Sequence, residues 1–204
     1  IKSKIHKKNI QVSFVPIEKL NKLTKNNHQG IVATISPIST LDINGLEGKL
    51  KNTKSLLMLV LDGITDTKNF GAIIRSAECF DVDLIIIPKT GSSPINGETI
   101  KSSSGAIFNV PICKVNHIKD AIFLLKENEI NLVGTSDKGL SSLYEHKFDS
   151  RTAIIIGSEG RGVNKSVLKL CDQVVSIVMY GRVSSLNVSV ATGIFLSEFR
   201  RQLN

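Results

Sequence analysis

The sequence predicts an α/β domain built on a mostly parallel sheet with helices on both faces. From Leu56 onward, apolar runs of strand length alternate with amphipathic segments of helix length. Several of the runs are continuously apolar, as residues 56–61 are, which is typical of parallel strands buried on both faces. A chain of 204 residues with 41% hydrophobic content can hold one domain of about 150 residues and part of another.

The expected elements divide the chain into three parts. Residues 55–204 form the main domain, residues 39–54 a linker rich in glycine and lysine, and residues 1–38 part of a smaller α/β domain. Strands are expected at 10–15, 30–35, 56–61, 84–87, 111–115, 131–135, 153–157 and 174–178. Helices are expected at 17–23, 69–80, 95–103, 117–128, 164–171 and 187–202.

The net charge of +8 is concentrated near the start of the sequence. Residues 1–54 contain ten lysines and three acids, whereas the remaining residues contain sixteen basic and fifteen acidic side chains. Two interpretations stay open: a segment that binds a polyanion, or a solvated lysine-rich surface. The segment contains no arginine, so its lysines would act as point charges on phosphates rather than read bases.

The remaining composition argues against a membrane protein, a disulfide framework and a metal site. No apolar run approaches the roughly 20 residues that span a bilayer, and the lysine-rich start lacks the apolar core of a signal peptide. We therefore expect a soluble protein of the cytoplasm or of an organelle matrix. The three cysteines lie far apart in apolar patterns and are expected to be buried thiols: Cys79, Cys113 and Cys171. Three of the four histidines, His28, His117 and His146, show no ligand spacing, and no metal dependence is expected.

An Asn-x-Gly-x-x-x-Arg pattern runs from Asn69 to Arg75 at the start of an expected helix. The apolar stripe of this helix consists of Phe70, Ile73, Ile74, Ala77 and Phe80. Arg75 falls off the stripe, toward the same end of the helix as Asn69. It is therefore either an ordinary surface arginine or a functional residue beside Asn69.

A glycine-rich turn follows the apolar run that ends at Gly157 and carries one carboxylate, Glu159. The glycines follow the order G-x-x-G-x-G, which excludes the dinucleotide fingerprint G-x-G-x-x-G. A phosphate-binding loop is excluded as well, because Gly162 is followed by Val163 instead of Lys. A tight strand-to-helix turn would explain the glycines but not Glu159.

The third pattern is Ser-Ser-Leu-Asn-Val-Ser at residues 184–189, where a loop becomes the last helix. Serine and asparagine are preferred caps at such a position, so capping alone could explain them. The three patterns together, in this order, resemble the three motifs of the SpoU family of RNA ribose 2′-O-methyltransferases in the SPOUT superfamily. The resemblance covers about residues 28–204, since His28-Gln29-Gly30 resembles the end of the small substrate-binding domain that precedes the catalytic domain in this family.

The resemblance implies a fold and an activity that the patterns alone do not show. The segment 153–204 would pass through a loop to form a deep trefoil knot, and two subunits would pair through their knot regions as a homodimer. The reaction would transfer the methyl group of S-adenosylmethionine to a ribose 2′-hydroxyl of RNA. Among family members, the 23S ribosomal RNA guanosine group is closest. Alternatives are a transfer RNA ribose methyltransferase and a non-catalytic RNA-binding or assembly protein.

The resemblance also implies roles for individual residues. Backbone groups at Gly157, Ile177 and Leu186 would contact the cofactor, and Thr135, at a strand end, is a further candidate, although Thr135-Ser136-Asp137 also fits a capping turn.

The catalytic candidates are Asn69, Arg75, Glu159, Ser185 and Asn187. Arg75 would clamp a phosphate and stabilise the developing alkoxide, because a guanidinium does not act as a base. Asn69 would hold either Arg75 or Glu159 in place. The two residues of the third motif would bind the ribose: Ser185 and Asn187.

Overall fold

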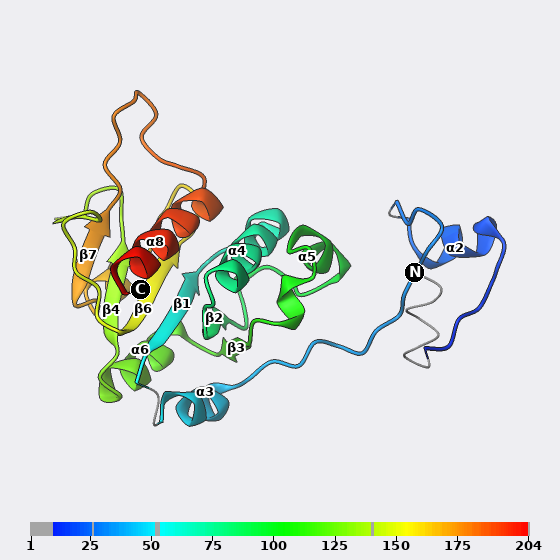
Figure 1. Ribbon diagram of the computed structural model, residues 1–204, viewed down its shortest axis with the longest axis horizontal. Coiled ribbons are helices and arrows are strands. Elements are labelled where there is room, and N and C mark those ends of the chain that lie inside the picture. Colours follow the sequence, from blue (N-terminus) through cyan, green and yellow to red (C-terminus); the bar gives the residue numbers. More distant parts are fainter. Residues whose placement is uncertain (1–9, 26, 52–53, 140, 204) are drawn as a thin grey trace. The chain divides into compact units, whose positions relative to one another are not determined.

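The computed structural model describes residues 10–25, 27–51, 54–139 and 141–203. The chain divides into two compact units, Ile1–Pro37 and Ile38–Asn204, here called unit 1 and unit 2. Unit 2 contains all of the sheet that the structure describes (Figure 1).

The sheet of unit 2 is parallel throughout, and its strand order is β3-β2-β1-β6-β4-β7-β5. The strands are β1 Leu56–Asp62, β2 Leu84–Pro88, β3 Ile112–Val115, β4 Asn131–Thr135, β5 Ser141–Ser142, β6 Arg151–Gly157 and β7 Gln173–Ser176. Apart from the two-residue strand β5, each was predicted from the sequence. The α/β fold class with a parallel sheet is therefore confirmed, whereas the trefoil knot stays a prediction.

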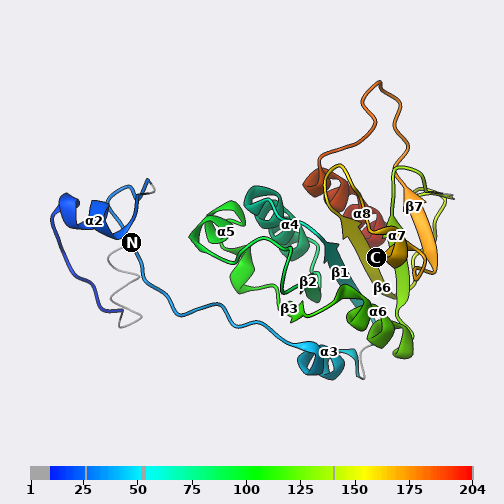
Figure 2. The same cartoon turned by 180° about the vertical axis from the view of Figure 1, so that it is seen from behind.

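Helices cover both faces of the sheet (Figures 1 and 2). One face packs against α4 Thr67–Cys79, α8 Val188–Leu203 and the 3-10 helix η1 Ala106–Phe108, with α5 Gly97–Ser102 beside α4. The other face packs against α3 Ile43–Leu50, α6 Ile118–Glu127 and α7 Lys165–Leu168. The predicted helices thus form, with ends that differ by up to three residues.

Alternate side chains of β1 enter the two cores. Leu57 and Leu59 face the α4 and α8 side, while Met58 and Val60 face the α3 and α6 side, and all four are at most 1% exposed. A strand flanked by helices on both faces needs this continuous apolar run, because neither of its faces meets water. Burial of four such side chains contributes about 6–12 kcal/mol before the cost of ordering the chain.

The helix α3 lies inside the segment that we predicted to be a linker. Asp42 caps it by accepting a hydrogen bond from the Gly45 N–H at 2.9 Å, and its apolar side chains Leu46 and Leu50 are buried. Leu41 also pairs with β3, since its N–H donates to the Ile112 carbonyl. The linker prediction gave weight to the glycines and lysines of 39–54 and overlooked the i, i+4 spacing of the two leucines.

Unit 1 contains the predicted helix, α2 Ile17–Leu23, but neither of the predicted strands. Residues 10–15 and 31–35 belong to no strand in the described part of the chain, and Gly30 lies in a turn with φ of 81°. Their apolar side chains stay exposed, as Phe14 does with 80% of its surface accessible. Apolar alternation predicts a strand only where a neighbouring strand supplies backbone hydrogen bonds, and no described residue of unit 1 does so.

Two of the three cysteines are buried or half-buried, as predicted, whereas Cys79 is exposed at the end of α4. Burial, with a smaller contribution from the charge of Asp42, raises the pKa of the Cys113 thiol to about 11. Burial likewise raises the pKa of Cys171 to about 11. Cys79 was predicted to be buried because it follows an apolar stripe, but it lies two residues beyond Ala77, the last buried position of α4, and two residues turn a helix by about 200°, away from the core. Within the described residues, no helix is long and apolar enough to cross a bilayer.

The contact between α4 and α5 depends on Gly71. A Cβ at this position would lie 1.9 Å from the Oγ atom of Ser102 and 2.6 Å from its Cβ atom. By contrast, Gly48 in α3 has no atom within 4 Å of the position of a Cβ. The glycine of the Asn-x-Gly pattern therefore has a packing role.

We predict that Gly71→Ala lowers the free energy of unfolding by about 1–3 kcal/mol, because α4 and α5 must separate. Gly48→Ala, the matched helical control, should raise it by about 0.5–1 kcal/mol, because alanine loses less backbone entropy on folding. Urea denaturation measures both. Equal effects of the two substitutions would contradict the assigned packing role of Gly71.

Candidate active site

The predicted site residues gather where the central strands end. β1, β6, β4 and β7 are neighbours in a parallel sheet, so their carboxyl ends lie at one edge, as the arrowheads in Figure 1 show. These ends carry Asp62, Gly157, Thr135 and Ser176. Ligands of open α/β sheets bind outside this edge.

Three side chains from three separate segments meet above this edge. The Asn69 Nδ2 donates to Glu159 Oε1 at 3.0 Å, and the Asn187 Nδ2 donates to the same oxygen at 2.9 Å. The Asn187 Nδ2 also donates to Asn69 Oδ1 at 2.9 Å. Residues 118 positions apart in the sequence thus form one cluster, here called the amide–carboxylate cluster, and each predicted motif supplies one member.

The turn that carries Glu159 folds back on its own beginning. The Gly162 N–H donates to the Ser158 carbonyl at 2.9 Å, and a Cβ at Gly157 would lie 1.9 Å from the Val163 nitrogen. Glycine is therefore required at 157 by the close approach of the backbone. Gly160 and Gly162 have φ of 80° and 68°, in the left-handed region that favours glycine.

Asn187 is the residue before α8 and both caps this helix and joins the cluster. Its Oδ1 accepts from the Ser189 N–H at 2.9 Å and from the Ser189 hydroxyl at 2.6 Å. Its amide hydrogens go to Asn69 and Glu159. The capping and functional interpretations of the third motif are thus compatible. In this arrangement, Asn187 has no amide hydrogen left for the ribose contact that we expected.

Asn69 is positioned by a capping residue that the sequence analysis did not single out. The Oδ1 of Asp66 accepts from the Asn69 N–H at 2.7 Å and caps α4. The sequence contains a signal for this cap, because aspartate is a preferred residue directly before the first turn of a helix, where it accepts from the N–H three positions later. Of the two partners expected for Asn69, the structure has Glu159 and not Arg75.

Arg75 and Ser185 lie outside the amide–carboxylate cluster. Both are exposed, and neither makes a hydrogen bond or ion pair with any residue that the structure describes. Arg75 lies on α4, six residues beyond Asn69, while Ser185 belongs to the β7–α8 loop, residues 177–187. The guanidinium and the hydroxyl are therefore free to contact a substrate.

The residues expected to contact S-adenosylmethionine line the same edge. Residues 177–186, which include Ile177 and Leu186, form no hydrogen bond within the described chain, and Leu186 exposes 37% of its surface. Figures 1 and 2 show this segment, in orange, projecting beyond the sheet edge. Free backbone donors and acceptors beside apolar side chains suit a ligand that combines a nucleoside with a charged amino acid, so these residues fit the cofactor.

Thr135 is at the same edge, but its hydroxyl hydrogen is already used. The Thr135 Oγ1 donates to the Ile155 carbonyl at 2.9 Å, across to β6. The following residues form a capping turn, in which the Lys138 N–H donates to the Ser136 Oγ at 3.1 Å. Thr135 can still offer a ligand the lone pairs of its oxygen.

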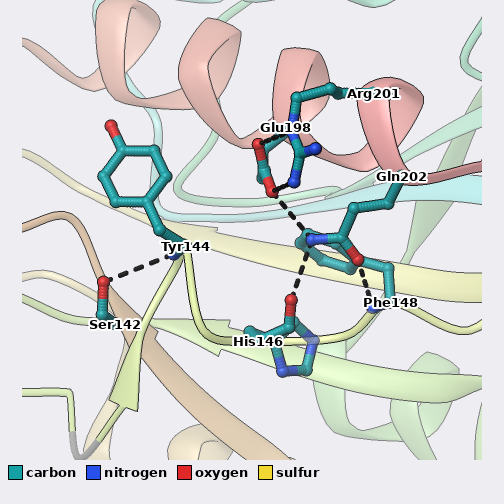
Figure 3. Close-up of polar contacts among 7 residues, drawn as sticks. All are labelled: Ser142, Tyr144, His146, Phe148, Glu198, Arg201 and Gln202. Carbon is teal, nitrogen blue, oxygen red and sulfur yellow. Dashed lines mark hydrogen bonds and ion pairs between the residues drawn. The ribbon is translucent and has the colours of Figure 1, made fainter.

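The far end of α8 is anchored by a second polar network (Figure 3). The Gln202 Nε2 donates to the His146 carbonyl at 2.8 Å, and the Gln202 Oε1 accepts from the Phe148 N–H at 3.0 Å. Glu198 accepts from Gln202 and, through both carboxylate oxygens, from Arg201. This network fixes the last turn of α8, the helix that begins directly after Asn187.

Two side chains of this network have shifted pKa values. The hydrogen bonds from Arg201 and Gln202 lower the pKa of Glu198 to about 2. Burial lowers the pKa of His146, and the charge of Asp149 offsets part of this shift. The His146 Nε2 is buried with no hydrogen-bond partner in the structure, so protonation of this ring would place an unpaired charge against Phe148.

No group of three or more His, Cys, Asp or Glu side chains that could hold a metal is found among the described residues.

The SpoU rRNA Methylase family matches residues 56–197, and the RNA 2′-O ribose methyltransferase substrate-binding family matches residues 1–41. The fold and the site thus define an α/β protein with a candidate ligand site at the carboxyl ends of its parallel strands. The chain belongs to the SpoU rRNA Methylase family.

Individual relatives agree with this assignment. The chain is 40% identical over 175 residues to the 23S rRNA (guanosine-2′-O-)-methyltransferase RlmB of Yersinia pestis, covering 86% of this chain and 71% of that protein. Identity to the Escherichia coli K12 enzyme of the same name is 39%, with 86% and 72% covered. The SpoU methyltransferase AviRb of Streptomyces viridochromogenes, solved in complex with the cofactor AdoMet, superposes with a TM-score of 0.73. Its identity is 27%, and the match covers 81% of this chain and 66% of that one.

We predict that stability falls in acid because His146 is held neutral. Since its folded pKa lies below the ordinary 6.5, its contribution is complete above pH 6.5 and is lost as pH falls through the lowered value. The contribution of Glu198 is complete above its ordinary 4.5 and is lost in a separate window, as pH falls from there toward about 2.

The measurement is the free energy of unfolding in urea at pH 7.5 and pH 5.5. His146→Phe keeps an aromatic ring against Phe148 and should lose part of this pH dependence. His117→Gln, at an exposed histidine, should keep the wild-type dependence. If both variants match the wild type in pH dependence, His146 is not the group responsible.

Proposed function

We propose that this chain transfers the methyl group of S-adenosylmethionine to the 2′-hydroxyl of a guanosine ribose in 23S ribosomal RNA. The observation that carries the proposal is the amide–carboxylate cluster, in which Asn69, Glu159 and Asn187 join the three family motifs at the ligand-binding edge of the sheet. The choice of guanosine and of 23S ribosomal RNA follows the RlmB relatives, which are 39–40% identical to this chain.

The bound cofactor supplies an electrophilic methyl group on a sulfonium centre. The chain holds it with backbone groups of the β7–α8 loop and of the Gly157–Gly162 turn, while apolar side chains such as Ile177 and Leu186 limit access of water. The ribose oxygen would form a bond to the methyl carbon while the carbon–sulfur bond breaks, which leaves a neutral thioether and releases the hydroxyl proton. The positive charge on sulfur is lost in this step, so a poorly solvated site favours the reaction. The main contribution of the protein is alignment of the two reacting atoms.

Arg75 is the residue assigned to the RNA. Its guanidinium is exposed, has no partner in the described chain and can form a two-pronged contact with a phosphate of the target nucleotide. It also stabilises negative charge that develops on the 2′-oxygen. Ser185 binds the ribose, and Asn69 and Asn187 fix the carboxylate of Glu159.

The curated sequence relatives favour ribosomal RNA over the transfer RNA alternative, because those at 39–40% identity are 23S ribosomal RNA enzymes. The solved structures do not separate the two alternatives: the TrmH/SpoU tRNA modifying enzyme of A. aeolicus is 28% identical and the rRNA methyltransferase of Sinorhizobium meliloti is 27% identical. A non-catalytic role is disfavoured because the three motif side chains are not only present but joined by hydrogen bonds.

Unit 1 binds the RNA substrate. Residues 1–41 match the substrate-binding family. Lys19 and Lys22 lie on α2, and Lys25 follows its C-cap Thr24, so three lysines are available to contact phosphates. An enzyme that modifies ribosomal RNA works where ribosomes are assembled, so we infer that this protein acts in the cytoplasm or in an organelle matrix.

The active protein is a homodimer through unit 2. The support is apolar surface on and beside α8: Val183 is 74% exposed in the β7–α8 loop, and Val190 is 50% exposed in the first turn of α8. Apolar side chains gathered beside an active site are typical of a surface that another chain covers. A trefoil knot formed by residues 153–204 would give that surface a fixed shape.

We predict that Arg75→Ala reduces methyl transfer at least 100-fold and leaves the affinity for S-adenosylmethionine within about threefold, because the side chain contacts RNA and not cofactor. Methylation of 23S ribosomal RNA fragments and titration calorimetry measure the two quantities. Lys119→Ala, which removes an exposed cation from α6, is the control and should retain full activity. A collapse of cofactor affinity in Arg75→Ala would place this residue in the cofactor site instead.

Sedimentation at micromolar concentration should show a dimer. Val190→Glu, which puts a charge on the apolar surface of α8, should shift the protein toward monomer because the charge would be desolvated in the interface. Phe123→Glu is the control, since Phe123 is similarly exposed, at 51%, but lies on α6 at the opposite face of the sheet. A fully active wild-type monomer would refute the dimer.

A further inference from the structure

Asp62 connects the end of β1 to the turn that carries Glu159. It is the last residue of β1, and its partner in the ladder with β6 is Gly157, where the turn begins. Its Oδ2 accepts a hydrogen bond at 2.8 Å from the backbone N–H of Asn164, which follows the end of the turn. One residue therefore pairs with the start of the turn through its backbone and with the exit through its side chain.

Contacts of the neighbouring residues fix the geometry of the turn in which this hydrogen bond forms. Gly63, with φ of 82°, brings the chain after Asp62 against Ser158, whose Cβ would be 3.6 Å from a Cβ at 63. Val163 is buried with 4% exposure. Asn164 caps α7 by accepting from the Ser166 N–H at 2.9 Å. The hydrogen bond to Asp62 is charge-assisted and hence stronger than a neutral one.

We propose that Asp62 is a positioning residue for methyl transfer, which closes the 157–163 turn and so holds Glu159 between Asn69 and Asn187. The inference rests on the proposed function of this site. The turn contains three glycines, and its internal hydrogen bond from Gly162 to Ser158 does not tie it to β1, so without the Asp62 bond the Glu159 carboxylate would sample positions outside the amide–carboxylate cluster. A displacement of about 1 Å in an aligned site can cost about 100-fold in rate.

Asp83, which lies just before β2, offers a matched control at the other end of β1. The Asp83 Oδ2 accepts from the Leu57 N–H, also at 2.8 Å, near the opposite end of β1. Both are carboxylate-to-backbone hydrogen bonds, but only the Asp62 bond lies at the site edge. Loss of either bond costs stability, whereas only loss of the Asp62 bond should affect catalysis.

The experiment compares Asp62→Ala, Asp62→Asn and Asp83→Ala in the full chain. Asp62→Ala should lower kcat about 10- to 100-fold at saturating RNA and S-adenosylmethionine, with little change in KM for RNA. Asp62→Asn keeps an acceptor oxygen and should restore kcat to within about fivefold of the wild type. Asp83→Ala should leave kcat unchanged. Equal losses in Asp62→Ala and Asp83→Ala, or an Asn variant as inactive as the Ala variant, would overturn the proposal.

A second pair of variants tests the donor side of the bond. Asn164 has φ of −55°, which proline adopts, so Asn164→Pro removes the N–H without imposing a new φ. Asn164→Ala removes the cap of α7 but keeps the N–H. Asn164→Pro should reproduce the loss of kcat seen in Asp62→Ala, whereas Asn164→Ala should not. The opposite result would also overturn the proposal, and this pair remains informative if Asp62→Ala does not fold.

Amide hydrogen exchange separates this inference from the proposed function. Exchange in residues 158–164 should accelerate in Asp62→Ala and stay at the wild-type rate in Asp83→Ala. Unchanged exchange in both variants would refute the role of Asp62 in closing the turn. If the wild type transfers no methyl group to any RNA while exchange responds as expected, the proposed function fails and the structural role of Asp62 stands.

Discussion

The site depends on one carboxylate oxygen that accepts two hydrogen bonds. Glu159 Oε1 receives amide hydrogens from Asn69 and Asn187, which come from α4 and from the start of α8. Each of the three segments has its own local support: Asp66 caps α4, the Gly157 turn folds back on Val163, and Asn187 caps α8. Because these supports are separate, the cluster forms only if all three segments place their side chains within hydrogen-bond distance of one another.

The parallel sheet makes this agreement possible. Strands β1 and β6 are adjacent and in register from Leu56 with Arg151 to Asp62 with Gly157, so the loops that follow them begin side by side. The loop after β1 leads into α4 with Asn69, and the loop after β6 is the Glu159 turn. A shift of the register by one residue would also move Leu57 and Met58 to the opposite faces of the sheet. Such a shift is unfavourable because each side chain is packed in the core on its own face.

Residue types and spacing predicted the strands of unit 2 apart from β5, and most helices, because continuous apolar runs and cap residues are local signals. The members of the amide–carboxylate cluster came from the resemblance of the three motifs to the SpoU family. The partner of Asn69 could not be chosen from the sequence, since Arg75 is near in the helix while Glu159 is 90 residues away. The helix α3 was missed because its two buried leucines were weighed less than its glycines. The anchoring of α8 by Gln202 was not predictable either, because its partners are the backbone groups of His146 and Phe148, which carry no sequence signal.

Asn187 shows why a helix cap and a functional residue can be the same side chain. Its Oδ1 is held by the Ser189 N–H and hydroxyl, and this fixes the amide plane so that Nδ2 faces Glu159 and Asn69. Aspartate would cap α8 equally well but would place a second negative oxygen against the Glu159 carboxylate. Serine would cap as well but would have no second donor for the cluster. Only asparagine combines an acceptor for the helix with donors for the carboxylate, so the preference for a capping residue and the requirement of the site select the same amino acid.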